Sequence, residues 1–197
     1  MRPDPRVVAA LVPEGARVLE LACGHGELLT ELAESRGCRV QGLERDAEAF
    51  HACVARGLPV VQGDVDDGLP EFEDDGFDLV VLSSSVQARR SPVRVLREMM
   101  RVAPAGILHF ANAGHWRLRA GLLLRGTVPT SRAVPDPWFA TPNVHPCTLR
   151  DFERLAAAEG LRVGARRLLA EDGGPAPPRA DRRPNLLAPG AAYLLTR

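Results

Sequence analysis

The stretch that most constrains the fold is residues 17–27, which reads Arg-Val-Leu-Glu-Leu-Ala-Cys-Gly-His-Gly-Glu. An apolar strand runs into a loop that contains Gly24 and Gly26, and a helix begins directly after it and ends at Gly37. This arrangement presents free backbone N–H groups and the positive end of a helix to an anionic ligand group. Glycine suits the turn because a Cβ would keep a ligand off the backbone or forbid the local φ. A glycine loop alone does not identify the ligand, so its interpretation depends on the residues at the ends of the later strands.

Further apolar runs alternate with helical patterns and predict four more strands, at residues 39–44, 59–62, 77–83 and 107–110. The near-continuous run at 77–83 is typical of a parallel strand covered on both faces. Asp46 is expected to cap the helix after the second strand, and that helix should bury Phe50, Cys53 and Val54. Two final strands are predicted at 162–169 and 191–196. Five strand–helix steps and a terminal strand pair predict an open, doubly wound α/β sheet.

The alternation loosens after residue 113. Residues 114–125 are predicted to be helical, 126–147 to be irregular, and Thr148 to start a helix with Asp151 completing a capping box. Residues 171–189, rich in Pro, Gly and Arg, are predicted to form a mobile loop. We expect the arginines of this loop to be solvated, with contact to an acidic partner as the alternative; they are Arg179, Arg182 and Arg183. A chain of 197 residues is most simply one domain, here residues 1–197.

Composition excludes several functions. All 25 basic residues are arginine, so a Schiff-base lysine, a pyridoxal-phosphate anchor and a P-loop lysine are impossible. The net charge of zero argues against nucleic acid as a partner. The four cysteines form no CxxC pair, so we expect neither a metal site nor a disulfide framework. No signal sequence or 18-residue apolar run is present, which predicts a cytoplasmic protein without a membrane partner.

Two acidic residues follow the second and third strands. Glu44 lies 18 residues after Gly26, where a carboxylate reaches the hydroxyls of a bound ribose in this topology. The alternative for Glu44 is a helix-start charge beside Arg45 and Asp46. Asp64 is suited to accept a hydrogen bond from an exocyclic adenine amine, and its alternative is a turn residue in the acidic run 64–67.

An NAD fingerprint requires Gly or Ala where Leu29 stands, and it leaves Glu20 and Asp64 unexplained. The whole set instead resembles the S-adenosylmethionine site of class I methyltransferases, with cofactor-binding candidates Glu20, Ala22, Gly24, Gly26, Glu44, Asp64, Val65 and Ser83. The resemblance implies that the glycine loop holds the methionyl part, the second strand's acid holds ribose, and the third site holds adenine. Ala22 departs from the pattern, which usually has glycine there.

A closer resemblance lies in segments at residues 95–99, 114–117, 122–126, 136–145 and 147–153, which are similar to those of the methionine biosynthesis family MetW. It extends to about residue 170, with departures at 83–87 and 110–112. It implies a Rossmann-like, mostly parallel seven-stranded sheet with an antiparallel terminal strand, and S-adenosyl-L-methionine or S-adenosyl-L-homocysteine as ligand. It also implies homoserine O-acyltransferase as the partner, with the protein supporting acylation.

The alternative function is methyl transfer to a small molecule, of quinone type or with another O- or C-acceptor. His115, His145 and Asn112 are the candidates for a general base, although methyl transfer depends mainly on alignment and does not require one. His109 lies inside a strand, where a packed core histidine is the favoured interpretation. The aromatic residues of 114–147 indicate either an acceptor pocket or a partner surface, and composition does not choose between them.

Overall fold

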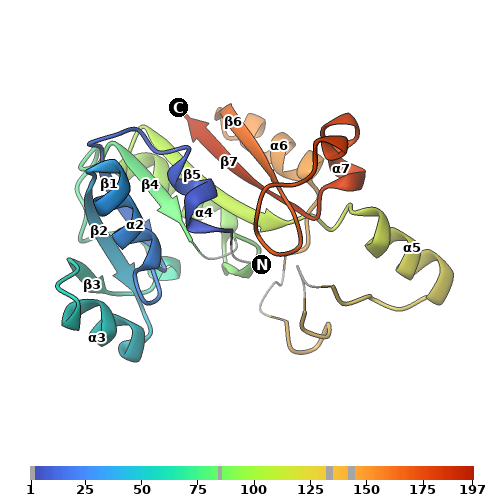
Figure 1. Ribbon diagram of the computed structural model, residues 1–197, viewed down its shortest axis with the longest axis horizontal. Helices are drawn as coiled ribbons and strands as arrows, with labels where there is room; N and C mark the ends of the chain where they lie inside the picture. Colours follow the sequence, from blue (N-terminus) through green and yellow to red (C-terminus); the bar gives the residue numbers. More distant parts are fainter. Residues whose placement is uncertain (1–2, 84–85, 132–134, 142–144) are drawn as a thin grey trace.

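The computed structural model describes residues 3–83, 86–131, 135–141 and 145–197 (Figure 1). These residues form a seven-stranded sheet in the order β3-β2-β1-β4-β5-β7-β6. The strands are β1 Arg17–Leu21, β2 Arg39–Glu44, β3 Val60–Gln62, β4 Leu79–Leu82, β5 Ala105–Ala111, β6 Arg162–Leu169 and β7 Gly190–Thr196. β7 runs antiparallel to both β5 and β6, and the pairs among β1 to β5 are parallel. The predicted doubly wound sheet with an antiparallel terminal strand is confirmed.

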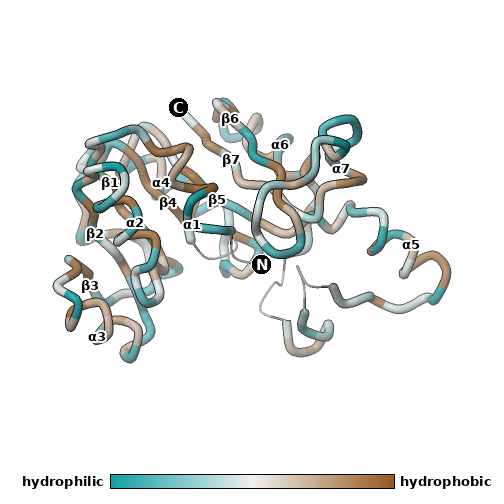
Figure 2. The backbone as a smooth tube through the Cα atoms, viewed as in Figure 1, coloured by the Kyte–Doolittle hydropathy of each residue, from teal (hydrophilic) through white to brown (hydrophobic). Residues whose placement is uncertain are grey.

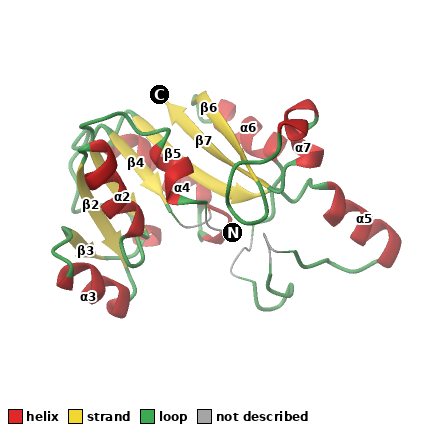
Figure 3. Cartoon of the chain, in the orientation of Figure 1, coloured by secondary structure: helices red, strands yellow, loops and turns green. Residues whose placement is uncertain are grey.

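Helices and 3₁₀ turns connect the strands (Figure 3). They are α1 Pro5–Ala9, α2 Glu27–Arg36, α3 Ala47–Ala55, η1 Val65–Asp67, η2 Val86–Ala88, α4 Pro92–Val102, α5 Trp116–Arg125, α6 Leu149–Ala158, η3 Pro178–Arg182 and α7 Pro184–Leu187. Their ends follow the expected local signals. Gly37 ends α2 in the left-handed conformation, the Asp46 side chain accepts from the Ala49 N–H, and Thr148 forms the capping box with Asp151.

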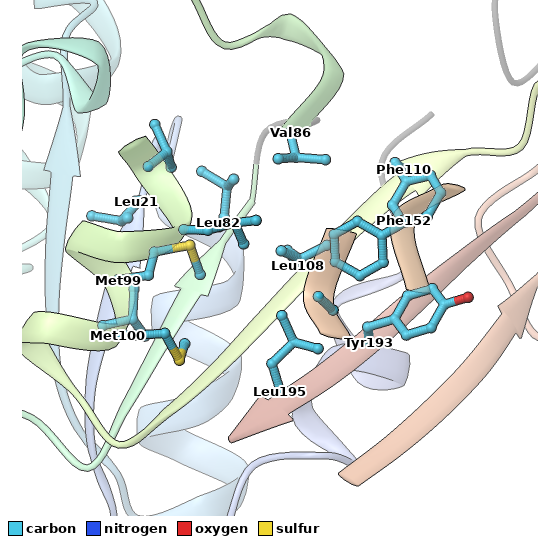
Figure 4. Packing of buried hydrophobic residues seen from close by; sticks show 14 of the residues in the cluster. Leu21, Leu82, Val86, Met99, Met100, Leu108, Phe110, Phe152, Tyr193 and Leu195 are labelled. Atoms are coloured by element: carbon cyan, nitrogen blue, oxygen red, sulfur yellow. The ribbon is translucent and has the colours of Figure 1, made fainter. Parts of the chain in front are cut away.

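Both faces of the sheet are covered, which explains why the central strand β4, Leu-Val-Val-Leu, is apolar and buried throughout. On one face, Val18, Val81 and Ile107 pack in one cluster with residues of α1 and α2. On the other face, the alternate residues of the same strands pack against α4 and α6 (Figure 4). Because successive side chains of a strand point to opposite faces, every second residue serves one of the two cores.

An aromatic cluster joins the antiparallel end of the sheet to α6. Phe110 of β5, Phe152 of α6 and Tyr193 of β7 have ring centroids 4.8 to 5.7 Å apart (Figure 4). The Tyr193 hydroxyl donates to Glu153 at 2.9 Å, and burial followed by this contact raises the tyrosine pKa. The cluster fixes the position of α6 relative to β5 and β7.

Two expectations need correction. Val54 of α3 is 49% exposed and Phe50 is only partly buried, because α3 covers the short edge strand β3 and buries only Ala49 and Cys53. The segment 171–189 is not irregular throughout, since it contains η3 and α7. Both elements begin at a proline, which is compatible with the first turn of a helix. The mobility of this segment stays a prediction.

Candidate functional site

The glycine loop follows β1 and is built from left-handed residues. Ala22, Gly24 and Gly26 have φ values of 56°, 59° and 79°. A Cβ at Gly26 would lie 2.4 Å from Leu58 Cδ1 and 3.1 Å from Cys53 Sγ, so a larger residue would have to displace the Leu58 side chain in addition to adopting a left-handed φ. The loop is therefore close-packed against its neighbour, and its conformation is set by sterics as well as by φ.

Glu44, the last residue of β2, holds this loop from the side. Its Oε2 accepts from the Gly24 N–H at 2.7 Å, and its Oε1 accepts from the Asp46 N–H at 2.8 Å. The side chain is 7% exposed. One carboxylate thus connects the turn after β1 to the start of α3. Glu44 lies at the end of its strand, as predicted for a ribose-binding acid, and it also interacts with the start of a helix, as its alternative interpretation expected.

The carbonyl groups of the loop are held from α3 and the turn after it. Cys53 Sγ donates to the Gly24 carbonyl at 3.1 Å. The Arg56 guanidinium donates to the His25 carbonyl and to Thr30 Oγ1, the latter at 2.7 Å. Sequence reasoning missed these contacts, because nothing in the local pattern around Cys53 and Arg56 indicates a partner some 30 residues earlier.

Glu20 is the fourth of the five residues of β1 and is 1% exposed. Its Oε1 accepts from the Ser83 hydroxyl, just after β4, at 2.6 Å. Both residues line a cavity of about 50 Å³ together with His109, and Pro5 and Val8 of α1 close it. This volume holds only a few water molecules. In this conformation Pro5 and Val8 of α1 therefore limit the size of the group that fits beside Glu20.

Asp64 and Val65 follow β3. Asp64 Oδ1 accepts from the Asp66 N–H at 2.9 Å and so caps η1, and its Oδ2 lies 3.3 Å from Arg45 Nη1. Burial acts to raise the pKa of Asp64, but the Asp66 N–H and the Arg45 guanidinium outweigh it and lower the pKa. The Gly63 N–H donates to the Glu44 carbonyl at 3.0 Å, so the ends of β2 and β3 are adjacent. Val65 is buried.

The three candidates for a general base lie apart from the Glu20 cavity. The buried Asn112 amide donates to the carbonyls of Asn185 and Ala188, at 3.1 and 2.8 Å, and its Oδ1 accepts from the Gly114 N–H. It therefore joins the end of β5 to α7. His115 is buried at the start of α5, whereas His145 is exposed and donates its backbone N–H to the Gln87 carbonyl.

A larger, apolar cavity of about 600 Å³ lies between α5 and the segment around Trp138. Its inner wall includes Gln87, whose side-chain amide bonds both the N–H and the carbonyl of Ala111 at the end of β5. Its outer parts are apolar and open: the lining residues Trp138 and Leu122 are 72% and 56% exposed. α5 buries no residue and projects away from the sheet (Figures 1 and 2). The sequence left an acceptor pocket and a partner surface open for this segment, and the structure places Trp138 in the wall of a cavity.

This sheet, with its glycine loop after β1 and an acid at the end of β2, has the fold of class I S-adenosylmethionine-dependent methyltransferases. A crystal structure of such a methyltransferase from Mesorhizobium loti superposes with a TM-score of 0.69 at 19% identity, covering 98% of this chain and 96% of that one. The chain belongs to the MetW family: it matches the family described as methionine biosynthesis protein MetW over residues 2–195. Among the described residues, the helices are too short or too polar to cross a bilayer.

Two curated relatives place the chain more closely. It is 33% identical over 161 residues to the bifunctional methionine biosynthesis protein MetXA/MetW of Rhodopirellula baltica, covering 77% of this chain. It is 32% identical over 165 residues to a probable phthiotriol/phenolphthiotriol dimycocerosates methyltransferase of Mycobacterium ulcerans, covering 80% of this chain. The chain spans 26% and 51% of the lengths of these relatives.

The left-handed Ala22 yields a stability prediction. Ala22→Gly should raise the free energy of unfolding by about 0.5–1 kcal/mol, because relief of the left-handed strain exceeds the added entropy of the unfolded chain. Urea denaturation measures the change. Ala49→Gly, in the right-handed helix α3, is the control and should lower the stability. Equal losses in both variants would contradict the left-handed assignment.

The buried His115 yields a pH prediction. Burial lowers its pKa below the ordinary 6.5, Glu171 opposes this shift, and Arg117 adds to it. The unfolded chain therefore binds the proton first as the pH falls, so stability is lost below about pH 6.5. The slope of the unfolding free energy against pH corresponds to at most one proton. His115→Gln should flatten the dependence of the unfolding free energy between about pH 5 and pH 7. The exposed His51→Gln is the control, and the same flattening there would contradict the assignment.

Proposed function

We propose that this protein binds S-adenosylmethionine or S-adenosylhomocysteine at the carboxyl edge of the sheet and acts with homoserine O-acyltransferase in methionine biosynthesis. The observation that carries the proposal is the Glu44 carboxylate, held at the end of β2 against the Gly24 N–H. At this position Glu44, which would bind the ribose, is hydrogen-bonded to the glycine loop, which would bind the methionyl group. Membership in the MetW family supports the pathway.

The residues at this edge fit the cofactor. Each Glu44 oxygen accepts one backbone N–H, and a carboxylate offers about four lone-pair sites, so two remain for ribose hydroxyls. Asp64 and Val65 stand beside Glu44 at the end of β3, where the acid would accept from the adenine amine and the apolar side chain would contact the ring. The bound cofactor would supply an electrophilic methyl group. Glu20 and Ser83 would hold its methionyl end once α1 has moved.

The partner role has two supports. The relative from Rhodopirellula baltica is named as bifunctional, with MetXA and MetW in one chain, as expected of two proteins that act together. On this chain, α5 and the Trp138 segment present exposed apolar side chains, among them Leu123, Leu124 and Phe139, which are 74–84% exposed. Apolar side chains gathered in this way on a protein surface indicate an interaction site. In this role the cofactor site would sense the pathway's downstream product.

Methyl transfer to a small molecule is the second candidate function. The apolar cavity of about 600 Å³ favours it, because the cavity reaches Gln87 and Ala111 beside the carboxyl ends of β4 and β5. Its volume lies within the usual range for ligand sites. The acceptor would be apolar, since few polar side chains line the cavity. Asn112 is used within the fold and His145 is exposed, so alignment of donor and acceptor would supply most of the rate enhancement.

The cofactor site is tested by two substitutions. Glu44→Ala should weaken S-adenosylhomocysteine binding by about 1.5–3 kcal/mol, the scale of hydrogen bonds to a charged group. Asp64→Ala should reduce the binding free energy by less than Glu44→Ala does, because it would remove only one contact, with the adenine amine. Isothermal titration calorimetry measures both, below the unfolding temperature of each variant. Glu48→Ala, an exposed acid at the start of α3, is the control. Parent-like affinity in both test variants would refute the ribose and adenine assignments.

The two functions are separated by a pair of variants. Leu123→Ala changes only the exposed surface of α5, whereas Trp138→Ala changes the exposed Trp138 segment and the wall of the apolar cavity. For a partner surface, both variants should reduce stimulation of the acyltransferase about tenfold or more while cofactor affinity is kept. If Trp138→Ala abolishes methyl transfer and Leu123→Ala has no effect on the acyltransferase, the methyltransferase function replaces the partner role.

A further inference from the structure

A third cavity, of about 360 Å³, lies where α5, α6, β6 and the segment around α7 meet. Half of its ten lining residues are arginines: Arg119, Arg150, Arg166, Arg182 and Arg183. The lining contains one acid, Glu153. The arginines come from distant parts of the sequence, and the fold brings them together in a chain whose net charge is zero.

Two of these arginines are engaged within the fold. Arg166 donates to Glu153 Oε1 at 2.8 Å, and the same oxygen accepts from the Tyr193 hydroxyl. Arg119 Nε donates to the Gly114 carbonyl at 2.6 Å. These contacts hold the guanidinium groups of Arg166 and Arg119 in place. The single carboxylate of the lining, that of Glu153, already accepts from both Arg166 and Tyr193.

The other three arginines have no acidic counterpart. Within the described part of the chain, Arg150, Arg182 and Arg183 form no ion pair, although all three are close enough to line one cavity. Some arginines elsewhere on the surface do pair, as Arg17 does with Asp78 at 2.8 Å and Arg97 with Glu159 at 2.7 Å, and what distinguishes Arg150, Arg182 and Arg183 is that they line one cavity together. Guanidinium groups gathered without counter-charge repel one another and attract anions.

We propose that this cavity binds a small polyanion that carries phosphate groups or several carboxylates. A guanidinium presents a planar fork of donors that matches both groups in bidentate geometry. The cavity volume suits a metabolite, and its arginines come from α5, α6, β6 and the segment of η3 and α7. The site is separate from the Glu44 edge, and the proposal does not depend on the function proposed above.

The test uses the full chain and two probes, inorganic pyrophosphate for the phosphate source and citrate for the carboxylate source. Thermal unfolding is followed at constant ionic strength, with potassium chloride as the balance. We expect saturable stabilisation by at least one probe. Arg150→Ala/Arg182→Ala should weaken the apparent affinity about tenfold or more. Arg179→Ala removes an exposed charge from η3 outside the cavity and should leave the affinity unchanged.

Three results would overturn the proposal. One is stabilisation no greater than that of potassium chloride, and another is an equal loss in the Arg179→Ala control. The third is that the double variant no longer binds an acidic protein partner while neither probe stabilises the parent protein. The cavity would then be a contact surface for a protein. S-adenosylhomocysteine affinity and circular dichroism are measured in parallel. They separate failure of this site from failure of the cofactor site and from misfolding.

Discussion

The hydrogen bonds of one carboxylate hold the turns at the carboxyl edge of the sheet together. Glu44 accepts from Gly24 after β1 and from Asp46 before α3, and its own carbonyl accepts from Gly63 after β3. Three consecutive strand ends are therefore fixed relative to a single residue. The same carboxylate keeps lone pairs for a ligand, so the interaction that orders the edge is also the one proposed to bind ribose.

The rest of the structure extends from this edge in two directions. Toward the N-terminus, α1 covers Glu20 and Ser83 and leaves little free volume beside them. The position of α1 therefore limits what can bind there. Toward the C-terminus, Asn112 connects the end of β5 to α7, and from there α5 projects with an apolar cavity on one side. The apolar cavity and the proposed partner surface thus share the segment that follows β5.

The sequence was sufficient where local signals decide the structure. Caps and glycine stops placed α2 and α6, and the bounds of β2 agree with the prediction to the residue. Local signals do not report tertiary partners. The helical period of α3 predicted a buried Val54, but the three-residue β3 beneath it is too short to cover that side. Asn112 bonds a carbonyl 73 residues later, and the arginine cavity gathers residues from 119 to 183, which no local pattern reveals.

We propose that the edge of the sheet around Glu44 is a cofactor site. Isothermal titration of S-adenosylmethionine and S-adenosylhomocysteine into the purified protein tests this proposal. We expect saturable heat from one site for at least one of the two ligands, with matching thermal stabilisation. No heat and no stabilisation at millimolar concentrations of either ligand would contradict it.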